Sequence, residues 1–434
     1  MDEPWLSELL ERATAGEPPI GPVARNSLRA GIRRRRRVQG SAACAAGVAV
    51  ICAAVLAVTG ASGTPGAATG TIPQTVYVLS MNGTVTPIST ATNTPGEPIA
   101  AGPAPRFMAL TPNGQTLYVA DGTDTVTPIA TATNTPGKPI KVGQDPSQIL
   151  FTPDGQTAYV ATYSGVTPIS TATNTPEKPI AGTGTGVGGP DVMALTPDGK
   201  TLYVASGNTA VIPVSTATNT PGKPIQVGDQ ASPQDDQMII TPDGSTLYVF
   251  SINGVVNLSG VITPVSTATN TPGQPIPVVA NLSFAMAMTP DGNTLYVAAG
   301  NGQDVVPVST ATNTPGPPIS VAGTLPYDIA VTPDGQTAYV ASQPGCRIQG
   351  RSLPPNCGLL EVTPISTATN TPGTPVKVTG GNLLMGGFAI TPDGKTIYII
   401  SGDDSTVTPI TTATNTPGQP INVAGRAQSI VITP

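Results

Sequence analysis

Residues 138–171 read KPIKVGQDPSQILFTPDGQTAYVATYSGVTPIST, and stretches of this kind fill residues 72–434 of the 434-residue chain. The motif Ala-Thr-Asn-Thr-Pro recurs between these stretches, and its successive starts lie 40 to 57 residues apart. It begins eight times, at Ala91, Ala132, Ala172, Ala217, Ala268, Ala311, Ala368 and Ala413. A second motif, Thr-Pro-Asp-Gly or Thr-Pro-Asn-Gly, keeps step with it from Thr111 onward. Self-similarity at such a period indicates a repeat architecture.

Each repeat contains four short apolar runs rich in Val, Ile and Tyr, bounded by turn residues, as is typical of β-strands. In residues 138–171 we expect an inner strand A at Ser147–Thr152, strand B at Thr157–Thr162 and strand C at Val166–Thr171. Strand D is the Pro-Ile run that follows the Ala-Thr-Asn-Thr-Pro motif. Asp154-Gly155 between A and B predicts a type I′ hairpin turn. Four antiparallel strands per period predict an all-β fold, a β-propeller.

The repeats resemble the YVTN family of propeller repeats. Residues Pro326–Val340 (PYDIAVTPDGQTAYV) and Val362–Thr371 (VTPISTATNT) carry the resemblance almost verbatim, and it extends over residues 72–434. It implies a fold and no particular activity, because propellers serve many unrelated functions. One departure is a proline in strand C of every repeat, for example Pro168. Proline cannot donate to a sheet ladder, so we expect strand D to pair only briefly with C and to leave a blunted outer edge.

The eight motifs predict eight blades, with seven as the alternative if one unit packs outside the ring. The first unit begins with a B strand at Ile72–Ser80, and the chain ends with an A strand at Ser429–Pro434. These two pieces complement each other. We therefore expect the C-terminal strand to pair with the N-terminal B strand and close the ring.

The first 71 residues have another composition. Residues 41–59 contain no charged residue and follow the arginine run Arg33–Arg37, which predicts a transmembrane signal anchor. Residues 1–40 would then be a cytoplasmic tail, residues 60–71 a linker, and residues 72–434 an extracellular propeller on a single-pass protein of the cell membrane. The alternative is a signal peptide cleaved near Ala61-Ser62-Gly63, which would release a secreted protein.

The charge and the cysteines are consistent with an exported domain. Residues 1–60 hold eight arginines against five acidic residues, and the rest holds eleven basic against twenty acidic residues. An acidic outer domain argues against nucleic acid as a partner. Cys346 and Cys357 are the two cysteines of the propeller region, and we expect a disulfide between them.

The chain contains no histidine, which excludes catalysis by Ser-His-Asp or Cys-His arrangements and histidine-based metal centres. The sequence nominates no catalytic residue, no metal centre and no cofactor. The repeated aspartates of Thr-Pro-Asp-Gly suggest a carboxylate ring, but we interpret each one as a turn former. They are Asp154, Asp198, Asp243, Asp291, Asp334 and Asp393.

In such a blade the A–B and C–D turns share one face, and the B–C and D–A loops share the other. The turns are nearly identical from repeat to repeat, whereas the loops differ, so the loop face is the predicted binding face. Its candidate residues are acidic side chains, which would bind Ca²⁺ if they bind a metal, and aromatic side chains that would stack on a ligand. They are Asp121, Asp124, Asp235, Asp236, Asp403, Asp404, Phe107, Tyr163, Phe284, Tyr327 and Phe388.

The sequence thus favours a binding or scaffolding module at a bacterial cell envelope, with an envelope protein or a glycan as its partner. The alternative is an exported propeller enzyme, lactonase-like or a metal-dependent hydrolase, that uses carboxylates of the loop face. We regard a non-enzymatic role as the better prediction.

Overall fold

The structure is a computed structural model of the whole chain. It describes residues 74–184, 192–206, 210–227, 237–253, 259–278, 283–299, 304–323, 325–343, 359–379, 387–401 and 405–434. All of them belong to one compact unit. The predicted N-terminal tail, membrane span and linker lie outside these residues.

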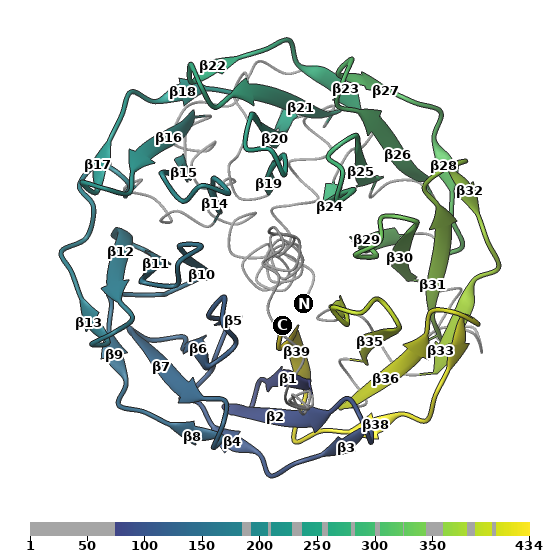
Figure 1. Cartoon of the computed structure of the whole chain (residues 1–434), viewed down its shortest axis with the longest axis horizontal. Helices are drawn as coiled ribbons and strands as arrows, with labels where there is room; N and C mark the ends of the chain where they lie inside the picture. Colours follow the sequence, from purple (N-terminus) through teal and green to yellow (C-terminus); the bar gives the residue numbers. More distant parts are fainter. Residues whose placement is uncertain are drawn as a thin grey trace, which may run out of the picture. The chain divides into compact units, whose positions relative to one another are not determined.

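Eight antiparallel sheets stand around a central axis and form an eight-bladed propeller (Figure 1). The prediction of eight blades is confirmed. Each sheet is ordered A-B-C-D from the axis outward, and we number the blades 1 to 8 by the chain order of their B strands. Successive strands are joined by hairpins, as the turn residues between the apolar runs predict.

Each blade contributes one strand of each kind, and the strands of a kind follow in order from blade 1 to blade 8. The A strands are β39 (Ala427–Ile432), β5 (Phe107–Leu110), β10 (Gln148–Phe151), β14 (Met193–Leu195), β19 (Gln237–Ile240), β24 (Ser283–Met288), β29 (Leu325–Val331) and β34 (Phe388–Ile390). The B strands are β1 (Thr75–Ser80), β6 (Thr116–Ala120), β11 (Thr157–Thr162), β15 (Thr201–Ser206), β20 (Thr246–Asn253), β25 (Thr294–Ala299), β30 (Thr337–Gln343) and β35 (Thr396–Ser401).

The C strands are β2 (Thr84–Ser89), β7 (Thr125–Ala130), β12 (Gly165–Ser170), β16 (Ala210–Ser215), β21 (Ser259–Ser266), β26 (Asp304–Ser309), β31 (Leu359–Ser366) and β36 (Thr406–Thr411). Strand D consists of two short pieces in seven blades and of the first piece alone in blade 3. The first pieces are β3 (Thr94–Pro95), β8 (Thr135–Pro136), β13 (Thr175–Pro176), β17 (Thr220–Pro221), β22 (Thr271–Pro272), β27 (Thr314–Pro315), β32 (Thr371–Pro372) and β37 (Thr416–Pro417). The second pieces are β4 (Ile99–Ala100), β9 (Ile140–Lys141), β18 (Ile225–Gln226), β23 (Ile276–Val278), β28 (Ile319–Ser320), β33 (Val376–Thr379) and β38 (Ile421–Asn422).

The ring closes through a composite blade, as predicted. β39 from the C-terminus pairs antiparallel with β1 along almost its whole length, with Tyr77 opposite Val431. Figure 1 shows β39 in yellow beside β1 in purple. Two further hydrogen bonds extend the pairing. The Thr433 amide donates to the Thr75 carbonyl at 3.0 Å, and the Thr75 amide donates to Thr433 Oγ1 at 2.9 Å.

The proline of strand C explains why strand D is split. In blade 1 Pro87 lies opposite Tyr77 in β1, and its carbonyl accepts a hydrogen bond from the Gly96 amide at 2.7 Å. In an antiparallel strand the amide and carbonyl of one residue point to the same side. The missing N–H of Pro87 therefore faces strand D between β3 and β4, where no donor is needed. The expectation of a brief C–D pairing is confirmed, and the proline-blunted outer edge stays a prediction.

One tyrosine of each B strand is buried and bonded to the next blade around the ring. Its hydroxyl donates to Oδ1 of the asparagine in the next blade's Ala-Thr-Asn-Thr-Pro turn, at 2.6–2.9 Å in seven of the eight pairs. The pairs are Tyr77–Asn134, Tyr118–Asn174, Tyr159–Asn219, Tyr203–Asn270, Tyr248–Asn313, Tyr296–Asn370, Tyr339–Asn415 and Tyr398–Asn93. The last pair joins blade 8 to blade 1, so the set of bonds is closed.

Asparagine is suited to this position for two reasons. All eight of these asparagines have φ between 50° and 55°, a left-handed conformation that asparagine adopts more readily than most side chains. Glycine would also accept this conformation, but it has no side-chain acceptor for the tyrosine. Asparagine supplies both the turn and the acceptor.

Apolar layers between neighbouring blades form the core. Between blades 2 and 3, for example, Tyr118 and Val126 pack with Ile149 and Phe151, and the Tyr118 and Phe151 rings meet edge-on with centroids 5.2 Å apart. The layer between blades 8 and 1 is of the same kind and contains Ile430 of β39. The closing seam is thus built like the others.

The described part of the chain contains no helix long and apolar enough to cross a bilayer. The predicted signal anchor at residues 41–59 is outside that part, so it remains a prediction.

The ring of tyrosines predicts a loss of stability in alkali. Burial raises the pKa of seven of them from 10.0 to about 12, and it raises that of Tyr339 as well. A raised folded-state pKa gives stability that is complete below the unfolded-state pKa and is lost as the pH rises through the folded-state pKa. We expect the melting temperature to be level up to about pH 10 and to fall steeply towards pH 12. In a Tyr163→Phe variant, which lacks the one tyrosine that is exposed among the described residues, tyrosinate absorbance should rise together with the loss of β-sheet circular dichroism. Tyrosinate formation near pH 10 without unfolding of this variant would contradict the account.

Candidate functional site: the loop face

The two faces of the ring differ in how they are built. The A–B and C–D turns form one face, which we call the turn face, and the B–C and D–A connections form the other, the loop face. Every gap in the described residues after residue 74 falls in a B–C or D–A connection. The complete part of the loop face is therefore that of residues 74–184, in blades 1 to 3.

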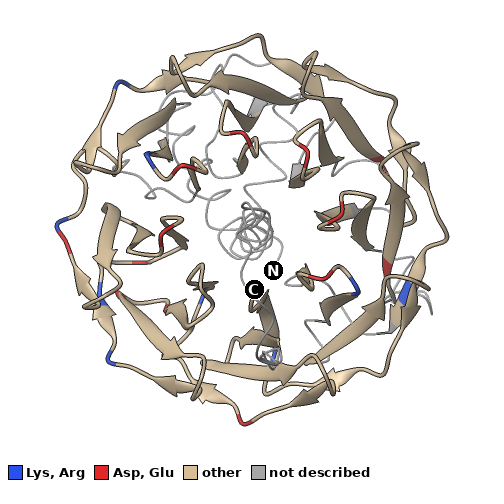
Figure 2. Cartoon of the chain, in the orientation of Figure 1, with Lys and Arg blue, Asp and Glu red and all other residues tan. Residues whose placement is uncertain are grey.

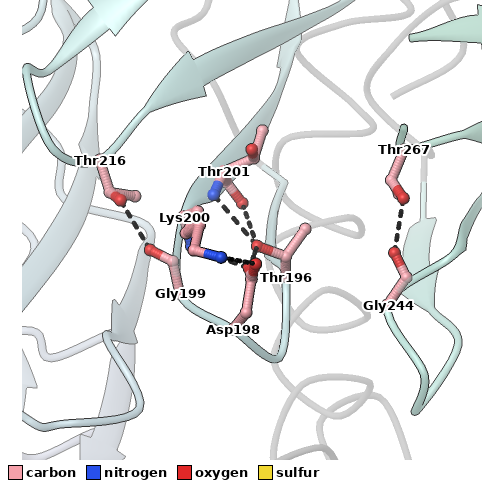
Figure 3. Close-up of polar contacts among 8 residues, drawn as sticks. All are labelled: Thr196, Asp198, Gly199, Lys200, Thr201, Thr216, Gly244 and Thr267. Atoms are coloured by element: carbon pink, nitrogen blue, oxygen red, sulfur yellow. Dashed lines mark hydrogen bonds and ion pairs between the residues drawn. The ribbon is translucent and has the colours of Figure 1, made fainter. Parts of the chain in front are cut away.

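On the turn face the aspartates hold their own turns together. In blade 4 the Asp198 carboxylate accepts hydrogen bonds from Thr196 Oγ1 at 2.7 Å and from the Lys200 amide at 3.0 Å (Figure 3). The Thr201 amide in turn donates to Thr196 Oγ1. These bonds, above all that of Thr196, lower the pKa of Asp198 to about 2. The interpretation of the repeated aspartates as turn formers agrees with this geometry, and Figure 2 shows the acidic residues at the inner turns.

The expected type I′ turn is not formed. In blade 3 the Gly155 amide donates to the Thr152 carbonyl at 2.7 Å, and Gly155 has a φ of 68° while Asp154 is not in the positive-φ region. A type I′ turn needs positive φ at both central residues. Pro153 at the second position of the turn, with Gly155 at its fourth, favours type I instead. The proline decides the turn type because it fixes φ near −65°.

Turn-face groups also join the turns to one another. In blades 2 to 8 the first threonine of the C–D turn donates to the glycine carbonyl of the A–B turn in its own blade, as Thr216 does to Gly199 and Thr267 to Gly244, both at 2.6 Å (Figure 3). In the composite blade 1 the equivalent Thr90 donates to the Gln74 carbonyl. A Cβ on Gly199 would lie 2.7 Å from Cδ of Pro153 in the preceding blade. The turn aspartates, the first threonines and the A–B glycines of this face are thus engaged in holding the fold.

On the loop face, Asp121 has its carboxylate satisfied within its own hairpin. It accepts the amides of Thr123 and Thr125 at 3.0 Å each and their hydroxyls at 2.8 and 2.7 Å. Burial opposes ionisation, but these four hydrogen bonds outweigh it and leave the pKa below its usual value. Asp124 forms an ion pair with Lys141 at 3.1 Å. Among the described residues no group of three or more His, Cys, Asp or Glu side chains is placed to hold a metal.

The aromatic candidates separate into exposed and buried side chains. Tyr163 projects from the B–C loop of blade 3 with 42% of its surface exposed. Phe107 begins β5 and Phe388 begins β34, and both are buried in the layers between blades, which removes them from the binding face. Tyr327 is half-buried in β29, and its hydroxyl has no hydrogen-bond partner among the described residues.

Several predicted residues lie outside the described part of the chain. They are Asp235, Asp236, Asp403, Asp404, Cys346, Cys357 and the side chain of Phe284. The predicted disulfide and the acidic pairs of blades 5 and 8 therefore stay predictions.

The sequence reasoning missed two kinds of residue. Met81, in the B–C loop of blade 1, is 42% exposed. Its place in a B–C connection of the predicted binding face was the available signal. At the innermost strands, Gln148 accepts the Met193 amide of the next blade at 2.6 Å. Asp328 similarly accepts the amides of Ile329 and Phe388, and burial raises its pKa well above the usual range. In the sequence, Gln148 and Asp328 are each a single polar residue in an apolar strand. Nothing in the sequence indicates that they accept a backbone amide of the next blade.

Comparison with known proteins extends to the fold alone. No protein-family model matches the chain, and no curated protein matches it in sequence, so the family resemblance of the repeats stays a prediction. Among solved structures, the dihydro-heme d1 dehydrogenase NirN in complex with DHE superposes with a TM-score of 0.65 at 14% identity, over 85% of this chain and 77% of that one. Apo AztD from Citrobacter koseri gives 0.55 at 14% identity, over 83% and 97%. Hydrazine synthase from Kuenenia stuttgartiensis gives 0.50 at 22% identity, over 65% and 96%.

We expect the turn aspartates to stabilise the fold by an amount that falls in acid. The asparagine at the equivalent position in blade 2 provides a control within the same chain. Because the pKa of Asp198 is lowered in the fold, its contribution is present above about pH 4 and is lost as the pH falls towards 2. In blade 2 Asn113 makes the equivalent bonds, from Thr111 Oγ1 at 2.8 Å and the Gln115 amide at 3.0 Å. Asp198→Asn should therefore fold, but be less stable than the parent at pH 7 by under about 1 kcal/mol, since the group is largely exposed.

The converse substitution, Asn113→Asp, should raise stability at pH 7 by a similar amount. Urea unfolding at pH 7 and at pH 2 or below measures both, and the two differences should shrink towards zero as the pH falls through about 2. Differences that are the same at both pH values would rule out the carboxylate as their cause.

Proposed function

We propose that this protein is a binding module of the cell envelope that recognises its partner through the loop face. The observation that carries the proposal is the exposure of Met81 and Tyr163, the two large apolar side chains that are exposed among the described residues. They project from the B–C loops of blades 1 and 3, on one face of a rigid ring. Tyrosine is enriched among the residues that dominate binding energy, and loops held on a rigid scaffold commonly carry binding residues.

The surroundings of these two residues support recognition rather than chemistry. Between them lie Asp121, bonded within its hairpin, and the ion pairs Asp124–Lys141 and Arg106–Asp145, the latter at 2.8 Å. An enzyme using carboxylates here would need one that is free to face its substrate. The described carboxylates of blade 2 are engaged with neighbours instead, so we favour a protein or glycan partner held by apolar contact.

The envelope location belongs to the proposal as well. It is supported by the uncharged segment 41–59 directly after the basic run Arg33–Arg37, which suits a single span with residues 1–40 in the cytoplasm. N-terminal sequencing of the mature protein distinguishes this from cleavage near residue 63. An intact N-terminus in carbonate-washed membranes supports the anchor, and a new N-terminus after residue 60 supports secretion.

The binding proposal is tested by substitution on each face separately. The loop-face variant carries Met81→Ser and Tyr163→Ser, and the matched turn-face control carries Gln115→Ser and Gln156→Ser, which are exposed residues of the A–B turns of blades 2 and 3. The immobilised full chain is used to capture partners from detergent-solubilised envelope. We expect the loop-face variant to bind its partner at least about tenfold more weakly, because each exposed anchor contributes on the order of 1–2 kcal/mol.

The control should bind like the parent, and both variants should melt like the parent. Equal capture by the parent and the loop-face variant would contradict the proposal. A partner lost only by the control would move the site to the turn face.

A further inference from the structure

The six residues Thr-Ala-Thr-Asn-Thr-Pro are identical in all eight C–D turns. The positions around them have changed between repeats. Two residues after the motif's proline stand Glu97, Lys138, Lys178, Lys223, Gln274, Pro317, Thr374 and Gln419. Buried positions have changed too, since Leu117 of β6 corresponds to Ala158 of β11. If the repeats were alike only because they arose by duplication, the exposed positions of the motif would differ between repeats at least as much as the buried positions do. Some further requirement therefore keeps the motif constant.

The fold accounts for part of the motif. The first threonine, for example Thr216, donates to the A–B turn of its own blade, and the asparagine, for example Asn219, accepts the tyrosine of the preceding blade. Proline at the sixth position pairs with strand C, as Pro221 does with Val214. The first threonine and the asparagine are thus fixed by their side-chain hydrogen bonds, and the proline lies in the short stretch that pairs with strand C.

The second threonine of the motif has no such requirement. It is exposed in every blade, at Thr92, Thr133, Thr173, Thr218, Thr269, Thr312, Thr369 and Thr414. In blades 1, 5, 6 and 7 its hydroxyl meets that of the threonine two residues later, at 2.7–2.9 Å. Hydrogen bonds of exposed hydroxyls compete with water and stabilise little. Exposed positions of this kind normally tolerate substitution with changes within about 0.5 kcal/mol, so folding does not explain eight identical threonines.

We propose that this second threonine is a site of covalent O-glycosylation. The surroundings suit a transferase that must reach the hydroxyl: alanine precedes it, no charged residue occurs in the motif, and a proline follows three residues later. Segments rich in Ser or Thr with Pro are typical of O-glycosylated regions. In the reaction the threonine Oγ attacks the anomeric carbon of a sugar phosphate donor. The glycosidic C–O bond forms, the bond from that carbon to the phosphate oxygen breaks, and the hydroxyl proton passes to a base of the transferase.

Eight such glycans would form a ring at the outer rim of the turn face. The loop face would be left uncovered, because it lies at the opposite ends of the strands. This inference does not depend on the proposed binding function, and either can fail without the other.

Mass spectrometry of the full chain tests the inference directly. The protein is isolated from the envelope of the cells that produce it and compared with the same chain made in the cytosol of a host. We expect residues 74–434 of the native protein to exceed their sequence mass by whole saccharide residues. Alkaline β-elimination should remove the excess and mark the modified threonines at the second motif position.

Two variants in blade 7 provide the matched control. Thr369 is the second threonine of its motif, whereas Thr374 is an exposed threonine that also precedes a proline but is not repeated in other blades. Thr369→Ala should remove one site and Thr374→Ala none. A native mass equal to the sequence mass overturns the inference, as does saccharide carried only outside the eight motifs.

Discussion

One hydrogen bond, from the hydroxyl of a buried tyrosine to an asparagine side chain, fastens each blade to the next. It recurs at all eight seams, including the seam between blades 8 and 1 where the chain's two ends meet. The tyrosine needs this acceptor because it is at most 2% exposed, and a buried hydroxyl without a partner is costly. The asparagine in turn needs its left-handed conformation to form the C–D turn. Turn geometry, blade packing and ring closure therefore depend on the same pair of residues.

This dependence separates the two faces of the propeller. The turns contribute the asparagine, the threonine that bonds to the A–B glycine, and the glycine that faces a proline of the preceding blade. Their composition is fixed by these contacts, and the turn face is uniform for that reason. The loop connections carry no part of the Tyr–Asn set, so they are free to differ from blade to blade. Exposed side chains such as Tyr163 can stand there without disturbing the ring.

Much of the fold could be predicted because it follows from period and local pattern. The eight blades, the pairing of β39 with β1 and the short outer strands all follow from the repeat count and from proline chemistry. The Tyr–Asn bond was not predicted, although one tyrosine and one asparagine per repeat were visible, because the partners come from neighbouring blades. The burial of Phe107 and Phe388 escaped prediction for a similar reason: their environment is set by the adjacent blade. The acidic pairs that begin at Asp235 and Asp403 lie outside the described residues, so their position on the loop face stays a prediction from the sequence.

A double-mutant cycle at the closing seam tests the central claim most directly. Tyr398→Phe keeps the ring and removes the hydroxyl, and Asn93→Gly keeps the left-handed turn and removes the acceptor. Urea unfolding of the parent, both single variants and the double variant gives the coupling free energy. We expect a coupling of about 1 kcal/mol at this seam, and an equal value for Tyr248 and Asn313 at an internal seam. Additive effects at both seams would contradict the claim that this bond fastens the blades.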